Sequence, residues 1–175
     1  SSSSRGLGDV YKRQILDIYN TDFDVETKTD SSPLTLADMA AHKIIVKGLS
    51  ELTPDIPIIS EESVLPEFSE RSKWPTYWLV DPLDGTKEFV NRNGEFTVNI
   101  ALINGNAPHV GVVCVPVQDR TYVGNTSTME ARVYSAAGES HAKSRRFSEK
   151  PNEIKVVASR SHVSDKLRAY LASLD

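Results

Sequence analysis

Residues 77–89 read Tyr-Trp-Leu-Val-Asp-Pro-Leu-Asp-Gly-Thr-Lys-Glu-Phe, and this stretch decides the fold prediction. The apolar run before Asp81 predicts a buried strand. Pro82 cannot donate a ladder hydrogen bond, so we expect the strand to stop there. Asp84 follows Asp81 across a tight turn, and both carboxylates can therefore converge on one point.

The two residues after this acidic turn predict an anion-binding backbone. Gly85 and Thr86 open a short helical stretch whose first N–H groups have no partner within the helix. Hard cations gathered by carboxylates beside such a turn are what phosphate ester hydrolysis needs. Taken alone, the Asp-Pro-Leu-Asp-Gly motif has a competing interpretation as an ordinary turn.

A second acidic element lies upstream of the first. Residues 56–60 predict a short apolar strand that runs into Ser60-Glu61-Glu62-Ser63. Together with Asp81 and Asp84, these residues place four acids at the ends of two neighbouring strands. Ligands commonly bind at the strand ends of α/β layers, so this edge is the predicted site.

Composition limits the class of protein. A chain of 175 residues, with 39% hydrophobic and 25% charged residues, fits one soluble domain or one domain plus part of another. A net charge of −4 argues against a nucleic-acid polymer as partner. It is compatible with a small anionic substrate, because bound Mg²⁺ reverses the local field.

The single cysteine and the hydropathy indicate a reducing, aqueous environment. Cys114 lies in an apolar strand, which predicts a buried inert thiol rather than a nucleophile or a disulfide. No apolar run is long enough to span a bilayer. We therefore expect a cytoplasmic location.

The order of elements predicts an α+β fold in which helices pack on one face of an antiparallel sheet. The clearest helix covers residues 35–52, and the hairpin signal is Asn104-Gly105. Residues 64–74 read as a charged loop and residues 86–91 as a short helix. The predicted apolar side of the first helix contains Leu36, Met39, Ala40, Ile44, Val46 and Leu49. The predicted strands are 56–60, 77–81, 96–103, 110–117, 120–124 and 131–135.

The C-terminal part reads differently. Residues 138–151 are polar and basic and predict an exposed linker, followed by a strand at 153–159. Ser164 is the expected N-cap of a last helix. The predicted apolar side of that helix contains Leu167, Tyr170, Leu171 and Leu174.

The two acidic motifs resemble the signature of the inositol monophosphatase-like superfamily of Mg²⁺-dependent, lithium-sensitive phosphatases. Within it, the continuation of the second motif is similar to the 3'(2'),5'-bisphosphate nucleotidases of the bacterial CysQ type. The resemblance runs from about residue 15 to residue 175. The segments that carry the nucleotidase pattern are 32–38, 87–89, 92–103 and 159–162.

The resemblance implies roles for particular residues. It implies two or three Mg²⁺ ions, with ligands at Glu61, Asp81, Asp84 and the main-chain carbonyl of Leu83. Glu61 and Thr86 would orient the attacking water. The implied substrate-binding residues are Glu61, Leu83, Asp84, Gly85 and Thr86.

Asp38 and Glu62 each have two interpretations. The resemblance implies that Asp38 is a catalytic carboxylate close to the metals. Thr35 followed by Asp38 also resembles a capping box, and helix capping alone would explain that residue. Glu62 reads either as a further metal-proximal carboxylate or as support for the ligands around it.

The resemblance also predicts the domain organisation: a layered α/β sandwich of the inositol monophosphatase type. One further Asp ligand, in a Trp-Asp-x-Ala-Ala motif, belongs to the second half of such enzymes, and this sequence has no Trp-Asp pair. Residues 1–14 read as a non-native or disordered leader with no signal-peptide core. We expect an N-terminal metal-binding α+β domain at 15–150 and the beginning of a truncated C-terminal α/β domain at 151–175.

The implied activity is Mg²⁺-dependent hydrolysis of adenosine 3',5'-bisphosphate to AMP and phosphate, within sulfur metabolism. The residues alone support only a phosphate monoester. One alternative is an inositol or sugar phosphatase, against which Lys87-Glu88 and residues 92–95 argue. Another is a catalytically inactive fragment that only binds metal. The resemblance leaves open peripheral association with the cytoplasmic face of the inner membrane and does not specify the oligomeric state.

Overall fold

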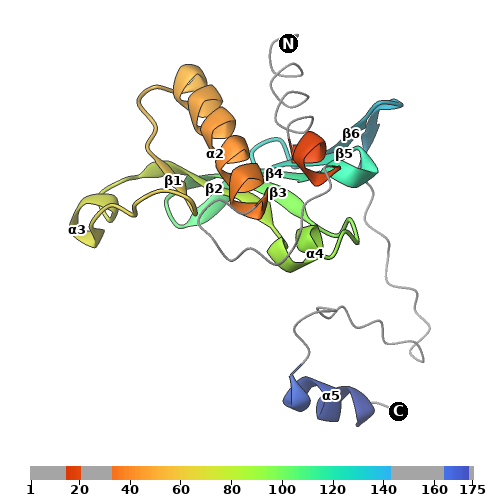
Figure 1. The fold of residues 1–175 in the computed structure, drawn as a ribbon. Helices are drawn as coiled ribbons and strands as arrows, with labels where there is room; N and C mark the ends of the chain where they lie inside the picture. The colour runs from red at the N-terminus through yellow and green to blue at the C-terminus, as the bar shows by residue number, and fades with distance from the viewer. Residues whose placement is uncertain (1–14, 21–32, 143–163, 174–175) are drawn as a thin grey trace. The chain divides into compact units, whose positions relative to one another are not determined.

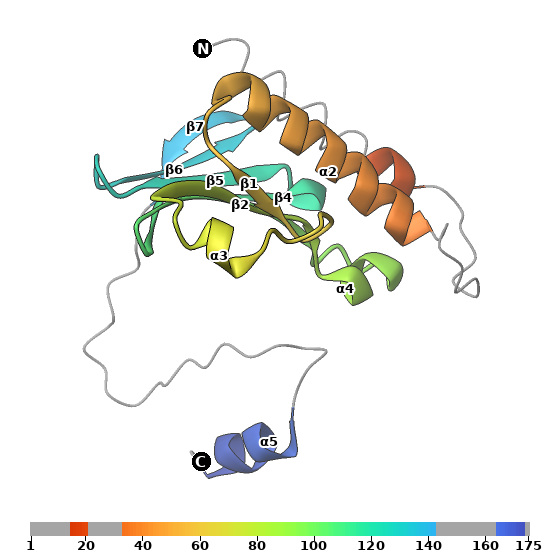
Figure 2. The ribbon, with the colours of Figure 1, turned by 90° about the vertical axis from the view of Figure 1, so that its left-hand side faces the viewer.

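The computed structural model describes residues 15–20, 33–142 and 164–173. The chain divides into two compact units, one of residues 1–143 and one of residues 144–175. The first unit consists of a twisted sheet with helices against it, as Figures 1 and 2 show. The site predicted from the sequence lies in this unit.

The sheet has seven strands in the order in which they follow along the chain. All neighbouring pairs are antiparallel except β1 and β2, which are parallel, so the prediction of a wholly antiparallel sheet is wrong at this edge. A parallel pair needs a crossover, which residues 61–75 supply with the short helix α3 (Phe68–Arg71). The strands are β1 Ile58–Ser60, β2 Thr76–Asp84, β3 Thr97–Asn104, β4 Ala107–Val115, β5 Arg120–Asn125, β6 Glu130–Ser135 and β7 Gly138–His141.

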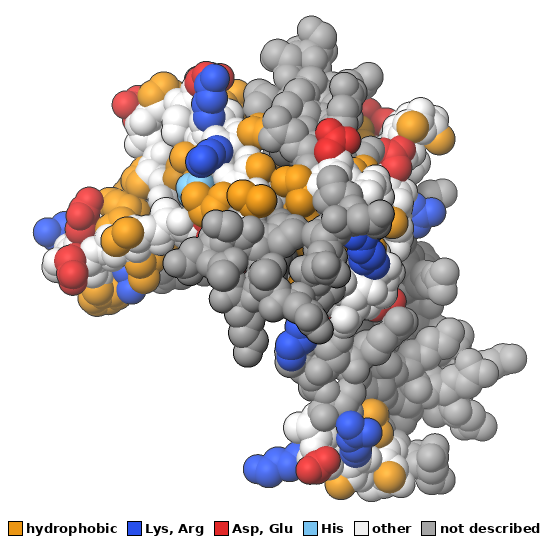
Figure 3. All heavy atoms as spheres, in the orientation of Figure 1, with side chains coloured by type: hydrophobic (Ala, Val, Ile, Leu, Met, Phe, Trp, Pro, Cys, Tyr) orange, Lys and Arg blue, Asp and Glu red, His pale blue; other side chains and the backbone are white. Residues whose placement is uncertain are grey.

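Two predicted loops contain regular structure. α3 lies inside the predicted charged loop, and Val64 and Phe68 there are 95% and 70% exposed. Hydrophobic side chains accordingly reach the surface around α3 in Figure 3. β7 lies inside the predicted linker and pairs with β6 through residues 138–141. Sequence patterning does not predict this strand, because all four residues are exposed and none has an apolar side chain.

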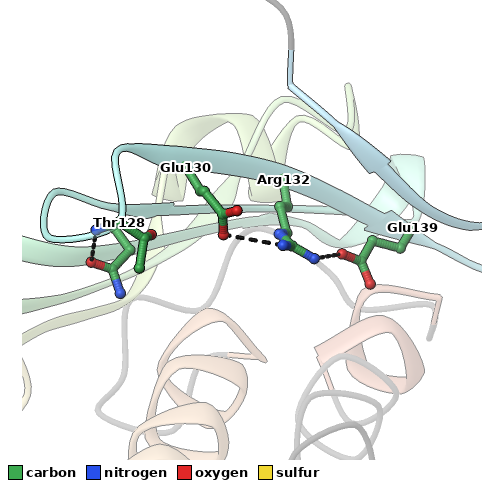
Figure 4. Close-up of polar contacts among 5 residues, drawn as sticks. Thr128, Glu130, Arg132 and Glu139 are labelled. Atoms are coloured by element: carbon green, nitrogen blue, oxygen red, sulfur yellow. Dashed lines mark hydrogen bonds and ion pairs between the residues drawn. The ribbon is translucent and has the colours of Figure 1, made fainter.

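An ion-pair cluster joins β6 to the edge strand β7. Arg132 on β6 forms ion pairs with Glu139 on β7 and, at 3.1 Å, with Glu130 on its own strand. Figure 4 shows the guanidinium between the two carboxylates. Glu139 first, and then Glu130, raise the pKa of Arg132 above its usual value. Each carboxylate here therefore has a cationic partner.

Helix α2 (Pro33–Leu52) and the helical residues 15–19 cover one face of the sheet (Figure 2). α2 buries a stripe at every fourth residue, as expected for a helix lying on a sheet. Leu36, which we placed on the apolar side, is 56% exposed, so the buried face is rotated from the predicted one. The buried stripe consists of Ala37, Ala41, Ile45 and Leu49.

The beginning of α2 also corrects the interpretation of Asp38. The helix starts at Pro33, two residues before Thr35, and its first turn contains no acidic residue. Pro at the first helical position is favourable because its missing N–H would have no partner there. Asp38 therefore lies inside the helix, and the capping-box interpretation is wrong.

Three aromatic rings fix the N-terminal helical residues and the short helix α4 (Thr86–Val90) to the sheet. The ring centroids of Tyr19, Phe89 and Phe96 lie 5.0–5.2 Å apart. Arg92 Nη1 also donates a 3.0 Å hydrogen bond to the Tyr19 carbonyl. Cys114 is buried in the same core and is free, as predicted. Leu83, whose carbonyl is a predicted metal ligand, belongs to the same core.

The second unit contains helix α5 (Asp165–Ala172). Its N-cap is Ser164, as predicted, and the Ser164 hydroxyl accepts a 3.2 Å hydrogen bond from Leu167 N. Tyr170, expected on the apolar side, is 60% exposed. The leader at 1–14, the strand at 153–159, the boundary at residue 150 and Leu174 lie outside the described residues. No described helix has the length and apolarity that crossing a membrane requires.

Candidate active site

The C-terminal end of β2 contains a β-bulge. Asp81 pairs with Asn99 and Asp84 with Thr97, so β2 has one residue more than β3 in this interval. The predicted end of the strand at Pro82 is therefore wrong, because the strand continues to Asp84. A proline is tolerated at a bulge, where no ladder hydrogen bond is required of it.

The bulge orients the side chains of Asp81 and Asp84, and the two residues between them are buried. The Leu83 side chain is only 1% exposed, and Pro82 is also fully buried. Leu83 N donates a 3.2 Å hydrogen bond to Asp81 Oδ1, which turns that carboxylate toward the local backbone. Asp84 is exposed at the end of the strand. The two carboxylates are close enough for Asp84 to act on Asp81 electrostatically.

Asn99 is a site residue that the sequence analysis missed. Its Nδ2 donates a 3.1 Å hydrogen bond to Asp84 Oδ2, and its backbone lies opposite Asp81 in the ladder. It thus connects the middle of β3 with both acids of β2. The available signal was an amide side chain inside the mostly apolar run at 96–103.

Gly85 permits the chain to pass from β2 into α4. Its φ is +95°, in the left-handed region that favours glycine. A Cβ atom there would lie 3.1 Å from the Glu95 carbonyl oxygen and 3.2 Å from Phe96 Cα. α4 then begins at Thr86, whose side chain is exposed. The predicted partnership of Thr86 with Glu61 stays a prediction.

The second acidic motif forms a closed turn after β1. Ser63 N and Ser63 Oγ both donate to the Ser60 carbonyl, at 3.1 and 2.9 Å, and Ser60 N donates to Ser63 Oγ at 3.2 Å. Glu61 N donates to the Val80 carbonyl at 3.1 Å, which ties the turn to β2. Glu61 and Glu62 are thus the two central residues of a braced turn.

Asp38 reaches the same place from α2. The residue is 9% exposed, and within the described structure its Oδ1 is buried without a hydrogen-bond partner. Burial raises the pKa of Asp38 to about 8, with further contributions from a hydrogen bond with Glu62 and from the charges of Glu62, Glu61 and Asp81. The carboxylates of the two acidic motifs, which we predicted to lie near Asp38, are therefore the groups that raise its pKa.

The pKa of Asp81 is raised by the same kinds of interaction. Burial raises its pKa to about 6, followed by the charges of Glu61 and Asp84 and a hydrogen bond with Glu61. The hydrogen bond from Leu83 N opposes this shift. A residue whose pKa is raised by burial and by like charges in one place is a candidate for a functional site.

This cluster fits a hard divalent cation in charge and in donor type. Carboxylate oxygens are the ligands that Mg²⁺ prefers, and a cation would neutralise the mutual repulsion and satisfy Asp38 Oδ1. In the arrangement described, no three Asp, Glu, His or Cys side chains among the described residues form a ready metal-binding group. The fit therefore concerns charge and chemistry, and it requires the side chains to close around the ion.

The sequence pattern of the inositol monophosphatase family matches residues 4–173 of the chain. The chain belongs to this family, whose enzymes are metal-dependent phosphatases that generally use Mg²⁺.

Among the relatives, the chain is similar to bisphosphate nucleotidases. It is 44% identical over 173 residues to the 3'(2'),5'-bisphosphate nucleotidase CysQ of Escherichia coli K12, which covers 98% of this chain and 66% of the relative. The identity to CysQ of Buchnera aphidicola is 42% over 170 residues, covering 91% of this chain and 59% of the relative. The chain thus spans just under two thirds of the length of these curated relatives.

Solved structures agree with the fold. CysQ of Bacteroides thetaiotaomicron matches with a TM-score of 0.74 and 39% identity, over 94% of this chain and 64% of that one. The suppressor protein SuhB of Bartonella henselae matches with a TM-score of 0.57 and 26% identity, over 76% and 51% of the two chains. The predicted fold class and the predicted family are both confirmed.

Proposed function

We propose that this chain contributes the metal- and phosphate-binding site of a Mg²⁺-dependent phosphatase that converts adenosine 3',5'-bisphosphate to AMP and phosphate. The observation that carries the proposal is the gathering of Asp38, Glu61, Asp81 and Asp84 at one end of the sheet. The similarity to CysQ nucleotidases supplies the substrate and the link to sulfur metabolism.

Glu61, Asp81, Asp84 and the Leu83 carbonyl are the groups we assign to Mg²⁺, with Asp38 beside them. When bound, Mg²⁺ supplies Lewis-acid stabilisation of charge on the phosphoryl group. The family resemblance implies two or three ions. Leu83 suits its role because its buried side chain fixes the position of the carbonyl.

The remaining groups would position the substrate and the water. The exposed Thr86 hydroxyl and the Glu61 carboxylate orient the attacking water, and Glu61 accepts its proton. The N–H groups of Gly85 and Thr86 contact the phosphoryl oxygens. Catalysis on this assignment consists of positioning and electrostatic stabilisation, without a covalent enzyme intermediate.

An inositol or sugar phosphatase is the second candidate function, because the family is that of the inositol monophosphatases and the fold is shared with an inositol monophosphatase of Zymomonas mobilis. The Lys87-Glu88 pair after the Gly-Thr turn favours the nucleotidase. We propose a cytoplasmic location, since the one cysteine is buried and free. Peripheral association with the cytoplasmic face of the inner membrane stays a prediction.

Phosphate release tests the proposal. The folded chain is incubated with Mg²⁺ and either adenosine 3',5'-bisphosphate or inositol 1-phosphate, each with an EDTA control. We expect EDTA-sensitive release that is at least about tenfold faster from the nucleotide. Faster release from the inositol ester would favour the second function.

The same assay addresses the catalytically inactive alternative. A chain that is folded and binds Mg²⁺ but releases phosphate from neither ester would contradict the proposed activity for this chain. It would leave the assignment of the metal site standing. Mg²⁺ binding is therefore measured on the same sample.

A further inference from the structure

His42 lies at the junction between α2 and the acidic turn. It follows Asp38 by one helical turn, so the two side chains lie on the same side of α2. Its Nδ1 and the Ser60 Oγ are joined by a 2.8 Å hydrogen bond. Ser60 is 3% exposed, so this bond connects α2 to a buried position at the end of β1.

Ser60 is the first residue of the turn that presents Glu61 and Glu62. Its backbone N–H and carbonyl are both used to close the turn on Ser63. Its hydroxyl is used by His42. Ser60 therefore contacts His42 through its side chain and closes the acidic turn through its backbone.

The other groups that face each other across this junction repel when ionised. The carboxylates of Glu62 and Glu61 both act on Asp38 from the turn. The buried stripe of α2 holds the helix on the sheet, and the His42–Ser60 hydrogen bond adds an attractive contact at the turn itself. The hydrogen bond between the imidazole and the hydroxyl is suited to this, since it requires no charge on either group.

We propose that His42 is a positioning residue that, through Ser60, sets the separation between Asp38 and the Glu61–Glu62 turn and thereby the affinity of the site for Mg²⁺. This inference rests on the proposed metal site of the proposed function. His42 does not touch the ion or the substrate in this assignment. It acts through the turn, as residues that orient metal ligands do.

The test measures Mg²⁺ affinity by isothermal titration calorimetry, with Mn²⁺ titration followed by electron paramagnetic resonance as a second probe. His42→Leu and Ser60→Ala should each weaken Mg²⁺ binding about tenfold, the lower end of the range for groups that orient ligands. The double variant should be no weaker than either single variant, because both remove the same bond. His42→Asn, which can place an amide near the position of Nδ1, should stay within about threefold of the unaltered chain.

The chain offers a matched control in a second histidine–serine pair. His109 Nε2 and Ser127 Oγ are joined at 3.2 Å in an exposed part of the sheet, at the opposite end of the strands from Asp81 and Asp84. His109→Leu removes the same kind of bond and should leave Mg²⁺ affinity unchanged. Unfolding in EDTA shows whether each variant is folded, and Ser60→Ala replaces His42→Leu if the latter is not.

The outcomes separate this inference from the proposed function. Mg²⁺ affinity of folded His42→Leu or Ser60→Ala within twofold of the unaltered chain would overturn the inference, whether or not phosphate is released. A second outcome is that His42→Leu and Ser60→Ala bind Mg²⁺ more weakly, that His42→Asn binds it nearly as well as the unaltered chain, and that none of these chains releases phosphate. This outcome would support the inference and contradict the proposed activity. An unaltered chain that binds no Mg²⁺ would overturn the inference.

Discussion

Acidic residues gather at two places in this sheet, and the two groups differ in how their charge is balanced. At the β6–β7 edge, Glu130 and Glu139 lie on either side of Arg132 and pair with it. At the β1–β2 end, the charges that act on Asp38 and Asp81 belong to other carboxylates. One group is paired with a cation, whereas in the other, among the described residues, the carboxylates raise one another's pKa.

This difference is the basis on which we assign the proposed cation site to the β1–β2 end. An exposed ion pair adds little to stability and needs no further partner. Carboxylates that raise one another's pKa cost stability unless something outside the chain compensates them. We call Asp38, Glu61, Glu62, Asp81 and Asp84 the unbalanced group, and the Arg132 cluster at the β6–β7 edge the balanced group. The residues of the unbalanced group lie on a braced turn, on a β-bulge and at a buried position of α2. The following experiments test this contrast between the two acidic groups, in order of expected effect.

The largest effect is expected from Asp81→Asn, which removes a proposed metal ligand at the centre of the unbalanced group. Mg²⁺-dependent phosphate release should fall at least about 100-fold, since a metal ligand is lost along with its charge. Glu139→Gln, in the balanced group, is the control and should keep activity within about twofold. Equal losses of phosphate release in the two variants would show that the two acidic groups do not differ in function.

The next effect is the pH dependence of stability without metal. Asp38 and Asp81 have pKa values of about 8 and 6 in the folded chain, against about 3.9 in an unfolded chain. Between pH 4 and 8 the folded chain therefore binds more protons, and the free energy of unfolding falls as pH rises.

We expect the Tm in EDTA to be at least about 5 °C lower at pH 8 than at pH 5. Mg²⁺ should reduce this difference, because it replaces the protons as the compensating charge. Asp38→Asn should reduce it as well, without metal. A Tm in EDTA that rises from pH 5 to pH 8 would contradict the raised pKa values.

A smaller effect is expected from Gly85→Ala beside the unbalanced group. The left-handed φ and the close approach to Glu95 and Phe96 should together lower the free energy of unfolding by about 1–3 kcal/mol. Gly105→Ala is the control, with φ +61° but open space around the added methyl group. In chemical denaturation, Gly105→Ala should lower the free energy of unfolding by less than Gly85→Ala does. An equal loss would show that the backbone around Gly85 does not pack tightly.

Much of this site could be predicted because it rests on local signals. The acids at 61, 81 and 84 adjoin apolar strands with turn residues, and the family pattern adds their roles. The bulge could not be predicted, since Pro82 predicts a strand end equally well. Asn99 and His42 act through contacts with residues 15 and 18 positions away, respectively. Such contacts depend on the register between elements, which local patterns do not specify.

The fold shows the same division. Helix α2 and the central strands were predicted from apolar periodicity and β propensity. Strand β7 was missed because Gly-Glu-Ser-His has no apolar alternation and is held by pairing to β6 and by the ion pairs of Arg132. The direction of β1 was missed because it depends on the crossover at 61–75 rather than on the strand itself.

The smallest effect is expected at the balanced group. Arg132→Leu removes both ion pairs and should loosen β7, which amide hydrogen exchange at residues 138–141 would detect as faster exchange. The Tm should change less than in Gly85→Ala, because the ion pairs are exposed. Mg²⁺ affinity should be unchanged. A large loss of Mg²⁺ affinity would show that the two groups are coupled.

The central claim is that the unbalanced carboxylates form a cation site, and calorimetric titration of the metal-free chain with Mg²⁺ tests it most directly. The account predicts saturable binding to the unaltered chain that Glu139→Gln retains and Asp81→Asn loses. Absence of binding to the folded chain, or equal binding by Asp81→Asn, would contradict it.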